Sequence, residues 1–437
     1  MRKGLIVGVL NERKNEWERR APLTPSDVKW LVDKGIRVEV ESSPIRVFPD
    51  SQYKNAGARI VKKTLNASLL VGIKEPLPEE VLEGKIYMLF SHTTKGQPYN
   101  LSLLKEFLKK RDTLIDYEKI TDFYGRRLVY FGRFAGICGV TDSLYYFGKK
   151  LEWKELANPF HGLKPSWKYR SLEELKKEMT RIGRRIRRGM FDWRISPFII
   201  GITGHGNVSR GAQEILGQLN PIEIHPRDMA RFIRRQKYER NKIYKIVFLR
   251  EEKLRARDGK GFYFEEYIHH PGKFESNLDK YLPYLNVLVH TSYWDKRYPR
   301  MVSREMLKNL SRSRKFRLRM IGDISCDIRG SIEITHKATT PDNPVYTYDP
   351  GKDRYTDGYE ADGVTVLAVD NLPAELPRDS SRNFGELIRD YVYQLAAHGV
   401  LDVTNHTAIP AELRRAVIAQ GKRLTKDYRY LKEYLDR

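Results

Sequence analysis

A short apolar segment that runs into a glycine-rich turn and then a helix constrains the fold of this 437-residue chain most. The segment, residues 197–216, reads Pro-Phe-Ile-Ile-Gly-Ile-Thr-Gly-His-Gly-Asn-Val-Ser-Arg-Gly-Ala-Gln-Glu-Ile-Leu. Gly204 and Gly206 allow a sharp turn and a close approach to a pyrophosphate, whose charge a helix N-terminus favours. With Asn207 and Val208 opening the helix, this context favours a dinucleotide-binding α/β unit over a purely structural turn.

The segment departs from the usual dinucleotide fingerprint in its third glycine. Ser209 occupies that place, and the next glycine is Gly211. The strand that follows, around residues 221–224, ends in His225 and Arg227 rather than in the acidic residue that usually binds the ribose hydroxyls of NAD. Arg227 is suited to pair with the 2′-phosphate of NADP, while the neighbouring Asp228 leaves NAD possible.

Two apolar stretches in the first third of the chain each end in a titratable side chain. Residues 69–73 lead to Lys74, and residues 88–91 lead to His92. The carboxyl ends of parallel strands lie at one edge of a sheet, where ligands bind in open α/β folds. We therefore expect Lys74 and His92 to form an acid–base pair, rather than two unrelated polar strand ends. Burial and a neighbouring positive charge both lower such pKa values toward neutrality.

The chain is strongly basic, with a formal net charge of +24. Basic stretches at residues 181–188 and 231–245 contain interleaved aromatic and apolar residues, but no nucleic-acid-binding module accompanies them. We interpret them as solvated faces and expect no specific nucleic-acid partner. Cys138 and Cys326 lack metal-ligand spacing, and no apolar run is long enough to span a membrane. These features predict a cytoplasmic protein without a metal site, and the N-terminus is interpreted as a first strand.

Alternating strand and helix patterns predict an α/β fold with two Rossmann-like parallel-sheet domains and an active-site cleft between them. We expect an N-terminal substrate-binding domain at residues 1–138, a dinucleotide-binding domain at 139–335, and a segment at 336–437 that packs back on the first domain. Within the second domain, two strands lead to Ser292 and Tyr293 and to Asp327 beside the cofactor. Residues 226–270 are expected to be a long excursion with one hairpin, and residues 411–419 a helix.

Several segments resemble a known enzyme family. Residues 17–25, Trp-Glu-Arg-Arg-Ala-Pro-Leu-Thr-Pro, resemble the signature shared by alanine dehydrogenase, transhydrogenase and saccharopine-forming enzymes. More specific segments lie, in order, at residues 90–97, 114–119, 131–136, 206–213, 293–300, 327–333 and 370–378. Together they resemble the lysine–ketoglutarate reductase domain of the bifunctional aminoadipic semialdehyde synthases of plants and animals. The resemblance runs from Gly4 to about Ile388 and does not reach the saccharopine-splitting domain of those proteins.

The resemblance implies that the chain condenses L-lysine with 2-oxoglutarate and reduces the imine with a nicotinamide cofactor to saccharopine, or catalyses the reverse. It implies Lys74 and His92 as the catalytic pair and NADP as the preferred cofactor. The remaining positions that it implies bind the substrates (Arg20, Lys95, Gln97, Glu118 and Phe131) or lie near the cofactor (Arg126 and Asp327). For Arg20 an ion pair with Glu18 is the alternative, and for Phe131 a place in the core.

Two other functions stay open from the sequence. One is an opine-type reductase, NAD-dependent, that takes another amine. The other is a non-catalytic, basic nucleic-acid-binding protein built on a dehydrogenase fold. The presence of Lys74, His92 and Arg20 argues against loss of catalysis.

Overall fold

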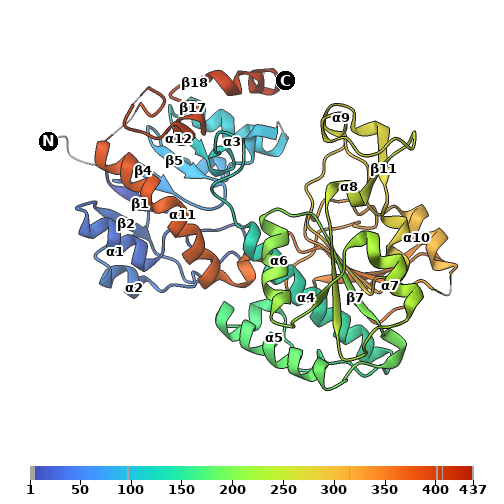
Figure 1. The fold of residues 1–437 in the computed structure, drawn as a ribbon. Helices are drawn as coiled ribbons and strands as arrows, with labels where there is room; N and C mark the ends of the chain where they lie inside the picture. Colours follow the sequence, from blue (N-terminus) through green and yellow to red (C-terminus); the bar gives the residue numbers. More distant parts are fainter. Residues whose placement is uncertain (1–4, 96–97, 314, 400–401, 406, 436–437) are drawn as a thin grey trace. The chain divides into compact units, whose positions relative to one another are not determined.

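The computed structural model describes residues 5–95, 98–313, 315–399, 402–405 and 407–435 (Figure 1). The chain forms two compact units, of which unit 1 comprises residues 1–131 and 377–437 and unit 2 comprises residues 132–376. Unit 1 therefore combines an N-terminal segment, blue in Figure 1, with a C-terminal segment, red in Figure 1. No helix in the described part of the chain is both long and apolar enough to cross a membrane.

Unit 1 is built on an eight-stranded sheet with the order β18-β17-β6-β5-β4-β1-β2-β3. The strands from β6 to β3 are parallel, and β17 and β18 add an antiparallel edge. The strands are β1 (Val7–Val9), β2 (Val38–Glu41), β3 (Arg59–Val61), β4 (Leu69–Val71), β5 (Ile86–Leu89), β6 (Thr113–Asp116), β17 (Val417–Gln420) and β18 (Arg423–Leu424). Their central members are apolar throughout because helices cover parallel sheets on both faces.

Six α-helices accompany the sheet of unit 1 in its described residues. They are α1 (Pro25–Asp33), α2 (Asp50–Asn55), α3 (Pro98–Lys109), α11 (Pro377–His398), α12 (Ala411–Arg415) and α13 (Lys432–Leu435). Helix α1 begins at a capping box, in which Thr24 Oγ1 accepts from the Asp27 amide and the Asp27 carboxylate accepts from the Thr24 amide. Gly385 of α11 lies against this carboxylate, since a Cβ there would come within 2.2 Å of Asp27 Oδ2.

Unit 2 contains a second eight-stranded sheet with the order β15-β14-β16-β13-β12-β7-β9-β8. The strands from β16 to β8 are parallel, whereas β14 and β15 form an antiparallel edge. The strands are β7 (Phe198–Thr203), β8 (Ile222–Glu223), β9 (Ile243–Phe248), β12 (Val287–His290), β13 (Met320–Asp323), β14 (Val345–Asp349), β15 (Arg354–Asp357) and β16 (Val364–Leu367). The expected α/β class with two Rossmann-like parallel sheets is confirmed.

The helices of unit 2 include one exceptionally close pair. Gly136 of α4 (Gly132–Trp153) and Gly211 of α6 (Asn207–Gly217) bring the two backbones together, because a Cβ at either glycine would lie 1.9 Å from a carbonyl oxygen of the other helix. Gly211 therefore serves helix packing, the task of the third glycine in the usual fingerprint. The other helices are α5 (Leu172–Arg187), α7 (Met229–Arg235), α8 (Arg250–Lys253), α9 (Phe264–His269) and α10 (Arg304–Ser311), and β10 (Leu254–Ala256) pairs with β11 (Phe274–Ser276).

The structure corrects three expectations. Residues 336–376 belong to unit 2, because they supply β14, β15 and β16 to its sheet, whereas residues 377–437 belong to unit 1 with the first domain. Unit 2 also begins earlier than expected, with α4 at Gly132. Residues 226–270 contain strand β9, whose six residues pair with β7, and β10, whose antiparallel partner β11 lies beyond residue 270. The helix expected at 411–419 ends at Arg415, and β17 follows because its backbone pairs with β6.

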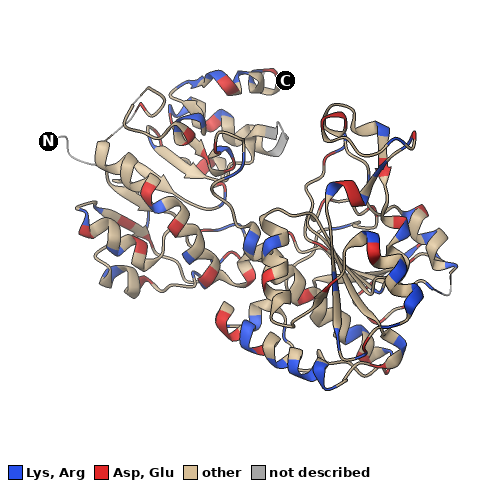
Figure 2. Ribbon diagram, viewed as in Figure 1, with Lys and Arg blue, Asp and Glu red and all other residues tan. Residues whose placement is uncertain are grey.

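The basic stretch at 181–188 is the exposed face of an amphipathic helix. Ser171 caps α5 by accepting from the Glu174 amide. Ile182, Gly183 and Ile186 are buried, whereas Arg184, Arg187 and Arg188 are exposed. Arg185 is half-buried and donates to the His161 carbonyl oxygen. Figure 2 shows basic residues along this helix with acidic residues at its start. This arrangement agrees with the interpretation as a solvated face.

Candidate active site and cofactor loop

Four titratable side chains follow the parallel strands β1, β4, β5 and β6 of unit 1 at their carboxyl ends. Glu12 follows β1, Lys74 follows β4, His92 follows β5 and Glu118 follows β6. These strands are direct neighbours in the order β6-β5-β4-β1. The topology therefore brings the expected pair Lys74 and His92 to one edge of the sheet, together with two carboxylates.

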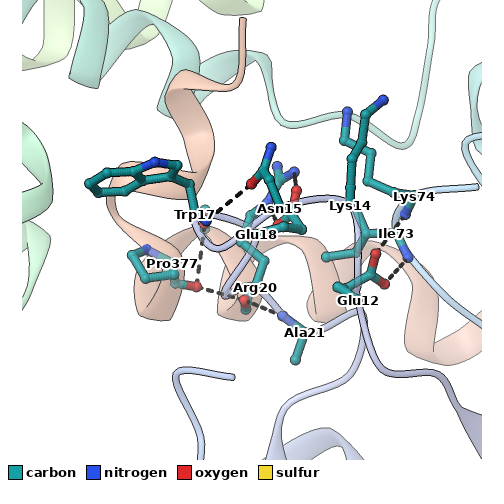
Figure 3. A network of polar contacts seen from close by, with 12 residues as sticks. Glu12, Lys14, Asn15, Trp17, Glu18, Arg20, Ala21, Ile73, Lys74 and Pro377 are labelled. Carbon is teal, nitrogen blue, oxygen red and sulfur yellow. Dashed lines mark hydrogen bonds and ion pairs between the residues drawn. The ribbon is translucent and has the colours of Figure 1, made fainter. Parts of the chain in front are cut away.

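Glu12 fixes the backbone that carries Lys74 (Figure 3). Its Oε1 accepts from the Ile73 amide at 2.6 Å and its Oε2 accepts from the Lys74 amide at 2.9 Å. Glu12 is buried, and burial, together with the nearby charge of Glu18, raises its pKa to about 7. The sequence analysis did not identify this residue. These two hydrogen bonds make Glu12 a positioning residue for Lys74.

A cavity of about 360 Å³ lies beside Glu12 and Lys74 within unit 1. Glu12, Lys14, Lys74 and Glu75 line it, and Lys14 forms a 2.9 Å ion pair with Glu75. The volume lies in the range of small-molecule pockets. With Arg13, Lys63, Glu41 and Glu80, the lining has four basic and four acidic side chains, a balance that is suited to a zwitterionic ligand.

We expect the stability conferred by Glu12 to depend on pH. The pKa of Glu12 is about 7 in the folded protein against a usual value of 4.5, so the folded state retains a proton that the unfolded chain releases. The contribution is therefore complete below pH 4.5 and is lost as pH rises through about 7. Urea unfolding should show that the stability advantage of the wild type over Glu12→Gln decreases across this interval.

The control for this prediction is Glu16→Gln, which changes an exposed carboxylate in the same segment. Its stability difference from the wild type should not vary with pH. An advantage over Glu12→Gln that grows with pH would contradict the assignment.

His92 is held in an unusual conformation. Its backbone φ is 53°, in the left-handed region that few residues other than glycine adopt. Backbone strain of this kind is concentrated at functional sites. The Asn100 side chain donates to the His92 carbonyl oxygen at 3.2 Å. Burial lowers the pKa of His92, the charge of Lys74 lowers it further, and Glu118 opposes this shift. His92 is therefore neutral near pH 7 and able to accept a proton.

Asp116 holds the turn before His92 from the neighbouring strand. Its Oδ2 accepts from the Ser91 hydroxyl at 2.5 Å and from the Ser91 amide at 3.3 Å. Its Oδ1 accepts from the Glu118 amide at 2.8 Å. Burial raises the pKa of Asp116 to about 6. One buried carboxylate thus links the segments that carry His92 and Glu118.

Arg20 lies in a buried ion pair, which is the alternative that the sequence left open. Its Nε donates to Glu18 Oε1 at 2.7 Å and its Nη2 donates to Glu18 Oε2 at 2.6 Å. The guanidinium lies 4.2 Å from the centre of the Phe131 ring, and that ring stacks on Phe384 at 4.3 Å. A role of Arg20 or Phe131 in substrate binding stays a prediction.

The other positions expected near the substrate are dispersed or not described. Glu118 forms an ion pair with Arg127 at 3.2 Å. Arg126, which was expected near the cofactor, pairs with Asp122 at 2.6 Å in an exposed turn of unit 1. Lys95 ends a short 3-10 helix, and nothing is described of its side chain. Gln97 lies outside the described residues.

The glycine-rich loop of unit 2 fits a dinucleotide pyrophosphate. Gly204 has a φ of +98°, and a Cβ there would lie 3.0 Å from Ser292 Oγ. Gly206 is the N-cap of α6 and has no atom within 4 Å of its Cβ position, so the N-terminus of the helix opens to free space. Its first turn, Asn207 and Val208 included, carries no side-chain cap. Amides without a cap and room for a ligand are what a pyrophosphate requires.

Next to this loop, the ends of three strands carry buried polar side chains. His290 Nδ1 and the Thr203 hydroxyl form a hydrogen bond of 2.8 Å. Burial lowers the pKa of His290 to about 3. Asp323 accepts from the Ser325 and Thr335 hydroxyls, and burial raises its pKa to about 6. The buried Lys253 donates to the Ser292 hydroxyl, and burial lowers the pKa of Lys253 to about 8.

The other two residues expected at this edge lie in loops. Tyr293 is largely exposed, and its hydroxyl donates to Asp295. Asp327 follows β13, and its carbonyl oxygen accepts from the Gly330 amide. Sequence reasoning missed Lys253, because the strand before it was not recognised.

The strand next to the fingerprint is not the one that the sequence predicted. β9 lies beside β7, and β8 pairs with the outer side of β9. The Gly204 amide accordingly donates to the Phe248 carbonyl oxygen at the end of β9. His225 lies 3.3 Å from Glu252 of α8, so the segments that follow β8 and β9 meet. Arg250 and Glu252 of α8 therefore lie in the segment that meets the one with His225 and Arg227.

Among the described residues, no group of three histidine, cysteine or carboxylate side chains is arranged to hold a metal ion. The two cysteines are both free. Burial raises the pKa of each thiol, so neither is a reactive thiolate.

Comparison with known proteins places the chain in a family. Residues 8–138 match the N-terminal domain of alanine dehydrogenase/PNT, and residues 250–426 match the C-terminal domain. Together the two matches include most of the chain, which therefore belongs to the alanine dehydrogenase/PNT family. The family resemblance deduced from the sequence motifs is confirmed.

Curated relatives narrow the resemblance. Alpha-aminoadipic semialdehyde synthase of Arabidopsis thaliana is 34% identical over 98% of this chain and 41% of its own length. The mitochondrial protein of that name from Bos taurus is 32% identical over 98% of this chain and 48% of its own length. The chain thus spans less than half the length of these relatives. Saccharopine dehydrogenase [NAD(+), L-lysine-forming] of Emericella nidulans is 27% identical over 86% of this chain and 89% of its own length.

Two solved structures share the fold. An L-alanine dehydrogenase superposes with a TM-score of 0.62 at 18% identity, covering 99% of this chain and 100% of its own. The transhydrogenase from Sinorhizobium meliloti gives a TM-score of 0.58 at 14% identity, covering 96% and 98%. At these identities the likeness concerns the fold alone.

Proposed function

We propose that this chain condenses L-lysine with 2-oxoglutarate and reduces the resulting imine with NAD(P)H to saccharopine, or catalyses the reverse reaction. The observation that carries the proposal is the arrangement of Lys74 and His92 at the ends of neighbouring strands. The buried Glu12 binds the Lys74 amide, and the buried Asp116 binds Ser91, the residue before His92. The names of the relatives, aminoadipic semialdehyde synthase and lysine-forming saccharopine dehydrogenase, support the choice of substrates.

The condensation requires several proton transfers, which the side chains of unit 1 are suited to perform. The ε-amine of lysine adds to the ketone carbon of 2-oxoglutarate, and a proton moves from nitrogen to oxygen to give a carbinolamine. Loss of water then gives the imine, and this step requires a proton donor at the departing hydroxyl. We assign that donor to the Lys74 ammonium, and His92, neutral near pH 7, receives protons from nitrogen.

Arg20 and Glu118 complete the proposed substrate site. We assign Arg20 to a substrate carboxylate, although Glu18 already occupies one edge of its guanidinium. Glu118 raises the pKa of His92 and so helps it to retain a proton once it has received one. The Phe131 ring packs against the Arg20 guanidinium, which lies over its face.

A nicotinamide cofactor would supply the hydride that reduces the imine carbon. In unit 2, the amides after Gly206 would hold the pyrophosphate, and Ser292 and Asp327 are proposed to lie near the nicotinamide. Lys253, which donates to the Ser292 hydroxyl, fixes the position of that side chain.

We infer that NADP(H) is preferred over NAD(H). Arg227 is largely exposed, and its ion-pair partner in the described part of the chain is Asp228, at 3.9 Å, so its guanidinium is accessible to a 2′-phosphate. Arg250 offers a second guanidinium after β9, next to the fingerprint strand. Glu252 near His225 is the feature that favours NAD(H) instead.

We expect Arg227→Ala to weaken NADPH binding more than NADH binding. The losses of binding free energy should differ by about 1–3 kcal/mol, the scale of a charge-assisted hydrogen bond. Dissociation constants from the quenching of protein fluorescence would measure this without turnover. Arg250→Ala tests the second guanidinium, and Arg231→Ala, an exposed arginine of α7, is the control. A wild type that binds NADH more tightly, with selectivity unchanged in both variants, would contradict the preference.

The reaction itself is tested by absorbance at the NAD(P)H band. Oxidation should require L-lysine and 2-oxoglutarate together and should not proceed with either one alone. Equal turnover with another amine, such as L-ornithine, would favour an opine-type reductase. No oxidation of NADPH or NADH with any pair of amine and oxo acid would contradict the proposed function.

A further inference from the structure

A second cavity lies in unit 2 at the edge of the sheet opposite the glycine-rich loop. It has a volume of about 710 Å³. Its lining includes residues that directly precede β12, β13 and β16, namely Asn286, Arg319 and Gly363. The antiparallel strand β14 ends there at Asp349, as its direction requires. The loop at Gly204 follows the carboxyl end of β7, so the length of the strands separates the two places.

The lining of this cavity is rich in cations. Five basic side chains contribute to it, against two carboxylates, Asp349 and Asp362. The basic residues are Lys150, Lys154, Arg194, Arg317 and Arg319. Lys154 pairs with Asp362, and Arg194 pairs with Asp192 at 2.7 Å. These pairs leave three cations to account for.

Lys150, Arg317 and Arg319 contact neutral oxygens rather than carboxylates. Lys150 is buried and donates to the Ala361 carbonyl and the Thr365 hydroxyl, both at 2.8 Å. Arg317 donates to the Ser196 carbonyl at 2.5 Å, and Arg319 donates to two carbonyls of its own segment. Within the described part of the chain, no carboxylate lies at ion-pair distance from any of the three.

Burial is the main cause of the pKa shifts of these groups. It lowers the pKa of Lys150 to about 7, with the charges of Arg319 and Lys154 acting in the same direction and that of Asp362 opposing them. Burial also lowers the pKa of Arg317, with Arg319 contributing in the same direction. Clustered positive charges that are partly buried and contact only neutral oxygens raise the free energy of the folded state unless an opposite charge is near. An anion bound in the cavity would relieve this cost.

From this geometry we propose that the cavity at the amino ends of the unit 2 strands binds a phosphate-bearing small molecule. Two guanidinium groups favour phosphate, because their planar donors bind its oxygens in pairs. The volume accommodates a phosphorylated metabolite of nucleotide size. The five basic side chains of the lining favour an anionic ligand over an apolar one. The site is distinct from the proposed dinucleotide loop and does not depend on the proposed reaction.

The test uses inorganic pyrophosphate as the probe and the full chain at 0.15 M NaCl. Calorimetric titration should detect binding of the wild type with a Kd below about 1 mM. The double change Arg317→Gln with Arg319→Gln should weaken binding at least about tenfold, the loss of one charge-assisted contact. Arg187→Gln with Arg188→Gln removes the same charge from the exposed end of α5 and should leave the Kd unchanged.

Two further measurements keep the outcome decisive. Saturating NADPH or NADH should not displace pyrophosphate, and displacement would assign the anion to the Gly204 loop and overturn the proposal. If the glutamine variant does not fold, Arg317→Lys with Arg319→Lys retains the charges but loses the planar paired donors, so it should weaken binding by about three- to tenfold. A Kd equal to that of the wild type would overturn the proposed role of the two guanidinium groups. Equal weakening by the control on α5, or no binding to the wild type, would also overturn the proposal.

Discussion

Replacing Lys74 with methionine is expected to lower kcat by about 10²–10⁴-fold, the usual contribution of a positioned proton-transfer group. Methionine retains the length and apolar stem of lysine but has no ammonium to donate a proton to the departing hydroxyl. The backbone should stay in place, because Glu12 binds the Lys74 amide rather than its side chain. Steady-state kinetics with saturating L-lysine, 2-oxoglutarate and cofactor would measure the change.

Two variants accompany this measurement. Lys54→Met, at an exposed position of α2, removes one charge from the same unit and should leave kcat unchanged. His92→Gln should lower kcat in the same direction as Lys74→Met and remove the same limb of the pH profile. A Lys74→Met enzyme with the turnover of the wild type would exclude Lys74 as the acid–base group.

Gly211→Ala is expected to destabilise unit 2 by more than about 3 kcal/mol, beyond the usual cost of overpacking a core. The added Cβ would lie 1.9 Å from the Arg133 carbonyl oxygen of α4, and a backbone atom cannot move aside as a flexible side chain does. The helices α4 and α6 would have to separate, which also displaces the N-terminus of α6. Urea unfolding, or loss of folded protein on expression, would reveal the effect.

Gly217→Ala is the matched control in the same helix. No atom lies within 4 Å of a Cβ at Gly217, so the substitution meets no obstacle there. Alanine should instead stabilise α6 by about 0.5–1 kcal/mol, because glycine loses more backbone entropy in a helix. Equal stability of the two variants would contradict the close contact between the α4 and α6 backbones at Gly211.

The elements with a strong local pattern could be predicted from the sequence. The β7–loop–α6 unit follows from its apolar run and its glycines, and the N-terminus of α1 follows from Thr24 and Pro25. β9 was missed because its sequence, Ile-Tyr-Lys-Ile-Val-Phe, lies within a highly charged region. Its lysine, Lys245, is accommodated by an ion pair with Glu223 at 2.7 Å, which only the tertiary structure provides.

The candidate site was predictable to a similar extent. The strand ends predicted Lys74 and His92, because the carboxyl edge of a parallel sheet is fixed by topology. Glu12 could not be recognised, since its role is to bind two amides that lie about sixty residues further along the chain. The Glu18 partner of Arg20 lies only two residues away, and the sequence alone does not decide between it and a substrate carboxylate.

The most direct test of the proposed reaction follows the ε-nitrogen of lysine. L-lysine labelled with ¹⁵N at the ε-position would be incubated with 2-oxoglutarate, NADPH and the purified chain, and the products analysed by mass spectrometry. The proposed function predicts one product, saccharopine, that carries the label in a secondary amine and forms in equal amount to the NADPH consumed. Label recovered in ammonia or in free glutamate, without a condensed product, would contradict it.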